Sequence, residues 1–92
     1  MGDKAITGKK HEIIKVFIVD DHELVREGLK TFLDAHDDIL VVGEAFDGES
    51  ALKKVQTVQP DVILMDLVMP KMDGITAIRK MKQTNPEIRI IA

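Results

Sequence analysis

Short apolar runs alternate along this chain with longer stretches in which apolar residues recur every three or four positions. The short runs are rich in β-branched residues, as is typical of strands buried on both faces of a sheet. They are Ile13–Val19, Ile39–Gly43, Val62–Met65 and Ile88–Ile91. The longer stretches have the period of amphipathic helices. Their apolar positions are Val25, Leu29, Phe32 and Leu33, then Ala51, Leu52, Val55 and Val58, then Ile75, Ile78 and Met81.

Capping residues and prolines mark the ends of these predicted helices. Asp21 is the expected N-cap of the first helix, and the segment that starts at Asp47 opens the second. Pro60 stops the second helix, and Asn85-Pro86 closes the third. The resulting order, β-α-β-α-β-α-β, predicts an α/β fold with an open parallel sheet and helices on both faces.

Composition narrows the class of protein. A chain of 92 residues forms one domain, which we place at residues 13–92, after a flexible leader or expression-derived segment at residues 1–12. The net charge of −3 argues against nucleic-acid binding by this segment itself. The lack of cysteine excludes disulfides and thiolate chemistry. No apolar run approaches the roughly 20 residues that span a bilayer, so we expect no membrane partner. The absence of cysteine fits a cytoplasmic protein.

Carboxylates stand directly behind two of the predicted strands. Asp20 and Asp21 follow the first strand, and Asp66 follows the third. In an open parallel sheet these strand ends share one edge, where ligands bind. Three close carboxylates repel one another, and Mg²⁺ relieves that repulsion through oxygen ligands. A carboxylate held there can attack phosphorus and form an acyl phosphate. The alternative is that these aspartates only cap helices and end strands.

Four segments make the pattern more specific. They are Asp20-Asp21-His22, Gly43-Glu44-Ala45, Asp47–Leu52 and Pro60–Gly74. Together they resemble a bacterial two-component receiver domain, of the subfamily usually joined to a helix-turn-helix DNA-binding domain. The resemblance runs from about Ile13 to Ala92. It implies a flavodoxin-like sheet with strand order 2-1-3-4, in which the fifth strand and last two helices of a complete receiver are absent.

The resemblance also implies roles for individual residues. Asp66 would accept a phosphoryl group from a histidine kinase or a small phosphodonor. Asp21, Asp66 and the backbone carbonyl of Val68 would bind Mg²⁺ directly, and Asp20 would act through a metal-bound water. The domain would be regulatory rather than an enzyme, and it would reach DNA only through an output domain outside this chain.

The chain also departs from the family. A complete receiver carries a later Ser or Thr that senses the phosphoryl group, and a Lys that pairs with it. Both are absent here, so we expect slow phosphorylation and impaired signalling. An apolar fourth strand at the sheet edge would favour dimerisation or element swapping. Two alternatives stay open: an inactive or engineered fragment, and an Asp-nucleophile Mg²⁺ phosphatase, although Val68 stands where such enzymes have an acid–base aspartate.

Overall fold

Strands and helices alternate in the computed structural model, which describes residues 12–66 and 74–91. In chain order the elements are β1 (Ile14–Val19), α2 (Glu23–Asp34), β2 (Ile39–Ala45), α3 (Gly48–Val58), β3 (Val62–Met65), α4 (Gly74–Thr84) and β4 (Arg89–Ile91). The predicted alternation is confirmed. The largest difference lies at β2, which continues to Ala45 instead of ending at Gly43.

The four strands form one parallel sheet in the order β2-β1-β3-β4, as predicted. Val19, the last residue of β1, pairs with Ala45 of β2 on one side and with Met65 of β3 on the other. Since each of these residues ends its own strand, the three carboxyl ends are level with one another. This register brings the residues that follow β1 and β3 to the same edge of the sheet.

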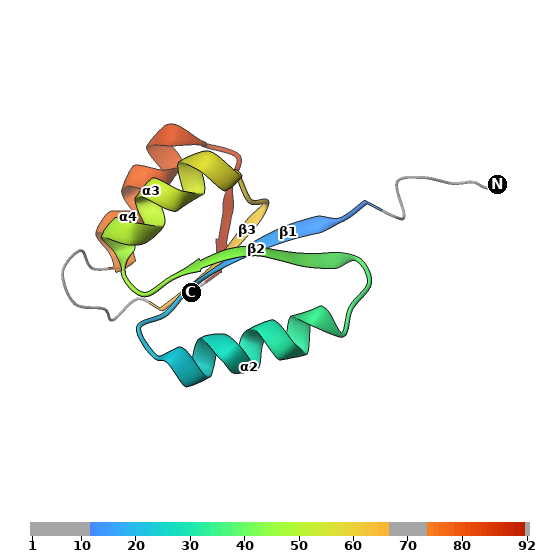
Figure 1. Ribbon diagram of the computed structural model, residues 1–92. Coiled ribbons are helices and arrows are strands. Elements are labelled where there is room, and N and C mark those ends of the chain that lie inside the picture. Colours follow the sequence, from blue (N-terminus) through green and yellow to red (C-terminus); the bar gives the residue numbers. More distant parts are fainter. Residues whose placement is uncertain (1–11, 67–73, 92) are drawn as a thin grey trace.

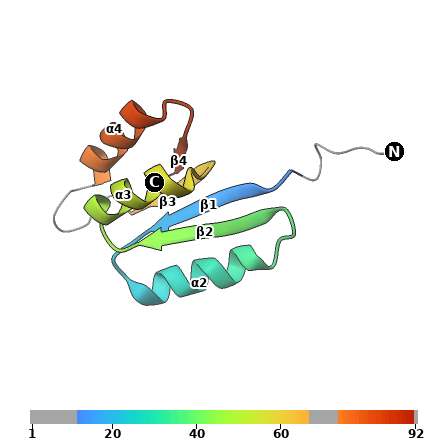
Figure 2. The ribbon, with the colours of Figure 1, turned by 45° about the horizontal axis from the view of Figure 1, so that its top comes forward.

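Helices cover the two faces of the sheet unequally. α2 lies on one face, and α3 and α4 lie together on the other (Figures 1 and 2). The main core fills the space between the sheet and the α3–α4 pair. Its buried residues are Phe17, Val19, Ala45, Ala51, Val55, Ile63, Met65, Ala77, Met81 and Ile88. The alternate residues of β1, Val16 and Ile18, are also buried, and strand geometry directs them to the opposite face.

The apolar stripe of α2 is less covered than its period suggests. Every residue of α2 is described and none is buried; Val25 is 44% exposed and Phe32 is 65% exposed. A single described helix on this face leaves part of the stripe in contact with solvent.

The inward face of α4 also differs from the prediction. Met81 is buried and Ile78 is partly buried, but Ile75 is 61% exposed and Ala77 is fully buried in its place. At about 100° per residue, Ile75 lies about 120° around the helix axis from Met81, whereas Ala77 lies about 40° away. The small Ala77 side chain lets α4 lie close to the core, and this selects the buried face.

α3 has well-defined ends. Asp47, which is 3% exposed, accepts a hydrogen bond at Oδ1 from the Ser50 backbone N–H at 2.7 Å and so caps the helix. At the other end Gln59 adopts a left-handed conformation with φ 48° and ψ 65°, and Pro60 follows. The predicted start and stop of this helix are both confirmed.

β1 and β2 approach each other closely at Gly43. The register between these strands shifts at Val16/Phe17, which pair with Val41 and Gly43 and so leave an irregularity in β2. A Cβ atom added to Gly43 would lie 2.8 Å from Cε2 of Phe17. The ring of Phe17 therefore occupies the space that any larger residue at position 43 would need.

None of the helices within residues 12–66 and 74–91 is long and apolar enough to cross a membrane.

Candidate functional site

Backbone hydrogen bonds continue one residue past the ends of β1 and β3. The N–H of Asp20 donates to the carbonyl of Ala45 at 3.1 Å, and the N–H of Asp66 donates to the carbonyl of Val19 at 2.9 Å. Each bond extends the parallel ladder to the first acidic residue behind a strand. The backbone positions of Asp20 and Asp66 are therefore set by the sheet and not by a loose loop.

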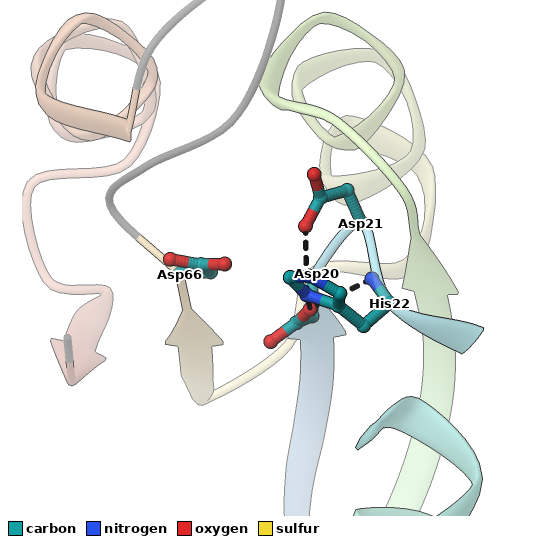
Figure 3. Close-up of side chains that lie close together, drawn as sticks. All are labelled: Asp20, Asp21, His22 and Asp66. Atoms are coloured by element: carbon teal, nitrogen blue, oxygen red, sulfur yellow. Dashed lines mark hydrogen bonds and ion pairs between the residues drawn. The ribbon is translucent and has the colours of Figure 1, made fainter. Parts of the chain in front are cut away.

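Four side chains converge at this edge of the sheet. Asp20, Asp21, His22 and Asp66 each offer one ligand atom, and these four atoms lie within 4.8 Å of one another. Figure 3 shows Asp66 at the tip of β3 and the other three residues behind β1. Asp20 and Asp66 are partly buried, whereas Asp21 and His22 are exposed. We call these four residues the acidic cluster.

His22 lies against both members of the aspartate pair (Figure 3). Its Nδ1 atom is 2.9 Å from Oδ1 of Asp20 and 2.9 Å from Oδ1 of Asp21. The hydrogen bond to Asp20 and the negative charge of Asp21 raise the pKa of His22 above its ordinary value of 6.5. The sequence-based site did not include His22; the available signal was its position directly after the acidic pair.

The turn between β1 and α2 corrects the role predicted for Asp21 as a helix cap. α2 begins at Glu23, so His22 occupies the N-cap position, and its side chain makes no capping hydrogen bond. Asp20 instead accepts a hydrogen bond at Oδ1 from the His22 backbone N–H at 2.8 Å. This hydrogen bond within the turn takes the place of the predicted Asp21 cap. The carboxylate of Asp21 therefore stays in the acidic cluster.

Some of the predicted site lies outside the described residues. Val68, whose carbonyl is an expected metal ligand, belongs to this part of the chain. The described chain resumes at Gly74, the first residue of α4. Of the predicted site residues, the described part of the chain brings together Asp20, Asp21 and Asp66.

The donor atoms of the acidic cluster fit a hard divalent cation. Three of the four residues supply carboxylate oxygens, which are the ligands that Mg²⁺ prefers, and Mg²⁺ usually binds through one or two carboxylates while keeping several waters. The partial exposure of the cluster leaves room for those waters. A cation at this position would offset the mutual repulsion of the carboxylates.

Comparison with known proteins gives the same class as the fold and the cluster. The family model described as response regulator receiver domain matches residues 16–92. Response regulator GacA of Pseudomonas syringae pv. syringae is 48% identical over 80 residues, which are 87% of this chain and 37% of that protein.

Two solved structures extend this comparison. The response regulator domain of Thermotoga maritima CheB superposes with a TM-score of 0.82 at 39% identity, covering 86% of this chain and 58% of that one. The isolated receiver domain of RcsB from Salmonella enterica serovar Typhimurium, determined in the presence of the phosphomimetic BeF3⁻, gives a TM-score of 0.79 at 32% identity. That match covers 86% of this chain and 59% of the other.

The chain belongs to the response regulator receiver domain family. It spans little more than a third, 37%, of the length of the first curated relative that it matches. The relatives are response regulators, which are regulatory proteins. The predicted family and the flavodoxin-like fold are both confirmed.

Proposed function

We propose that this chain is the phosphoacceptor receiver of a two-component response regulator and that Asp66 takes the phosphoryl group. One observation carries the proposal. Asp66 follows β3 directly, and the ligand atoms of Asp66, Asp20 and Asp21 lie within 4.8 Å of one another. The RcsB receiver, which shares this fold, was studied with a phosphomimetic, and this supports the same chemistry here.

The proposed reaction is a phosphoryl transfer from a phosphohistidine of a kinase to Asp66. An Oδ atom of Asp66 attacks phosphorus, and the new O–P bond forms as the P–N bond of the phosphohistidine breaks. The electron pair of the broken bond stays on the imidazole nitrogen of the kinase, which takes up a proton. The product is an acyl phosphate on Asp66. With a small donor such as acetyl phosphate, a P–O bond breaks instead and acetate leaves with the electron pair.

Mg²⁺ is the cofactor that we propose for this site. Asp21, Asp66 and the Val68 carbonyl would hold it directly, and Asp20 would hold it through a water. When bound, the metal neutralises negative charge on the phosphoryl oxygens. The carboxylates of Asp20 and Asp21 would orient the ion beside Asp66, and the partial burial of Asp20 and Asp66 would limit the water that competes with the phosphodonor.

Partners and location follow from the same proposal. The proposed partner is a histidine kinase, and contact with DNA would require an output domain outside these residues. A cytoplasmic location suits a kinase substrate of this kind.

A second copy of this chain is a further proposed partner, because β4 is the last strand of the described sheet and Ile91 on it is 56% exposed. Sedimentation that detects only monomer at high concentration would contradict this association.

Intact mass after incubation with acetyl phosphate and Mg²⁺ tests the role of Asp66. We expect one added phosphoryl group that is lost in Asp66→Asn and kept in Asp37→Asn, a matched change at an exposed turn residue. We expect slow modification of these 92 residues and faster modification of a longer chain that carries the family's later Lys and Ser or Thr. Modification of Asp66→Asn, or labelling at another residue, would refute the assignment.

A further inference from the structure

Arg26 connects the acidic cluster to strand β2. This residue lies on α2, one turn after the cluster, and its side chain is only 16% exposed. Its Nε donates a hydrogen bond to Oε1 of Glu44 at 2.8 Å, and its Nη1 donates to the backbone carbonyl of Asp20 at 2.7 Å. The rigid fork of a guanidinium can make two such bonds at once, which an ammonium cannot do with the same geometry.

These bonds close a ring around Asp20. Glu44 and Ala45 are consecutive in β2, and the Ala45 carbonyl accepts the N–H of Asp20 at 3.1 Å. Both backbone groups of Asp20 are therefore bound to the same two residues of β2, one directly and one through Arg26. Glu44 is itself held by Nζ of Lys30, 2.7 Å from its Oε2.

The charges of this ring support its rigidity. The Lys30 ammonium and the Arg26 guanidinium hold the pKa of Glu44 below its usual range, so Glu44 stays ionised as a fixed acceptor for Arg26. Lys54 of α3 adds a hydrogen bond to the Glu44 backbone carbonyl at 3.1 Å. Glu44 is thus anchored on three sides, and Arg26 transmits its position to Asp20.

We propose that Arg26, oriented by Glu44, is a positioning residue for the metal site of this receiver. The carbonyl that it binds belongs to the peptide unit joining Asp20 to Asp21. Because a peptide unit is planar, holding that oxygen restrains ψ of Asp20 and φ of Asp21 together, and with them the directions of the Cα–Cβ bonds that carry both carboxylates. Mg²⁺ requires nearly ideal octahedral geometry, so its affinity depends on those directions.

This inference rests on the proposed function of the acidic cluster, and it makes a prediction opposite in sign to simple electrostatics. Arg26 carries a positive charge close to a proposed cation site. If the residue acted only through charge, its removal would strengthen Mg²⁺ binding. If it positions Asp20 and Asp21, its removal weakens binding despite the lost repulsion, by about 10–100-fold, as when residues that orient metal ligands are removed elsewhere.

The experiment measures the Mg²⁺ dissociation constant by calorimetry, together with urea unfolding, for the unmodified chain and four variants, of which Asp21→Asn removes a proposed metal ligand. Arg26→Gln removes the fork, and Arg26→Lys keeps the charge but not the paired bonds. Lys30→Met is the matched control, since it removes a cation that binds Glu44 from the same helix without touching Asp20. We expect weaker Mg²⁺ binding in both Arg26 variants, with Arg26→Lys giving little rescue. Lys30→Met should have a much smaller effect, because Arg26 and Lys54 still hold Glu44.

The possible results separate the two proposals. The proposed metal site is refuted if the unmodified chain does not bind Mg²⁺, or if Asp21→Asn binds Mg²⁺ as tightly as the unmodified chain. If that binding is present and the Arg26 variants bind Mg²⁺ equally or more tightly, the positioning role is refuted. Equal weakening by Lys30→Met also refutes it, because a general loss of stability then explains the effect. If Arg26→Gln fails to fold, the Mg²⁺ dissociation constants of Arg26→Lys and Lys30→Met are compared in the same way.

Discussion

Gly43 offers a sharp test of the packing between β1 and β2. Its substitution by alanine adds one methyl group at a point where the structure leaves no room. The new Cβ would lie 2.8 Å from Cε2 and 3.0 Å from Cδ2 of Phe17, whereas carbon atoms pack best at about 3.5–4.0 Å. Phe17 is fully buried, so its ring cannot turn away into solvent.

Two opposing contributions set the expected magnitude. Overpacking of a buried site typically costs about 1–3 kcal/mol. Replacing glycine within a strand also removes backbone freedom from the unfolded chain, which returns about 0.5–1 kcal/mol. The net effect of Gly43→Ala is therefore a loss of up to about 2.5 kcal/mol in the free energy of unfolding, with a central value of about 1 kcal/mol. Each kcal/mol lowers the Tm of a domain of this size by roughly 4–8 °C.

Gly28 provides the matched control in the same chain. It lies in the middle of α2, and an added Cβ meets nothing within 4 Å. Gly28→Ala should therefore raise the free energy of unfolding by about 0.5–1 kcal/mol through helix propensity alone. Replacing glycine by alanine should therefore stabilise the protein at position 28 and destabilise it at position 43.

Urea unfolding followed by far-UV circular dichroism measures both effects, since the sequence contains no Trp or Tyr. A double-mutant cycle with Phe17→Leu isolates the contact, because leucine lacks the ring atoms that meet position 43. In that background Gly43→Ala should cost much less. A stable Gly43→Ala variant, or an equal cost with and without the Phe17 ring, would refute the proposed clash.

Three further expectations concern local features. Asp47→Ala removes the acceptor for the Ser50 N–H, so we expect a loss of about 1–2 kcal/mol in urea unfolding; an unchanged midpoint would contradict the cap. Gln59 has φ 48°, so Gln59→Gly should gain about 0.5–1 kcal/mol in the same assay, and a loss would argue against the left-handed conformation. The pKa of His22 is raised above 6.5, first by Asp20. Its contribution to stability is therefore full below pH 6.5 and disappears as pH rises through the raised value; in an NMR titration, Asp20→Asn should lower this pKa toward 6.5, and an unchanged value would exclude Asp20 as the main cause.

The sequence alone determined the order of elements and the edge at which the carboxylates meet. Strand and helix periods are local properties, so the alternation could be read directly from apolar spacing. Asp20, Asp21 and Asp66 follow strands of a parallel sheet, and this topology places strand ends together without knowledge of any side-chain contact. The family motifs then gave the class of protein, which the comparisons confirm.

Only the tertiary structure decided how residues from different elements meet. The period of α4 made Ile75 a candidate for burial, yet packing against α3 and the sheet selected Ala77. His22 contacts both Asp20 and Asp21 because of the turn between β1 and α2. In this turn His22 occupies the N-cap position of α2, where the sequence predicted Asp21. The ring of Asp20, Arg26, Glu44 and Ala45 joins residues up to 25 positions apart through the pairing of β1 with β2. Such contacts depend on the exact spacing of the packed elements, which no local pattern in the sequence specifies.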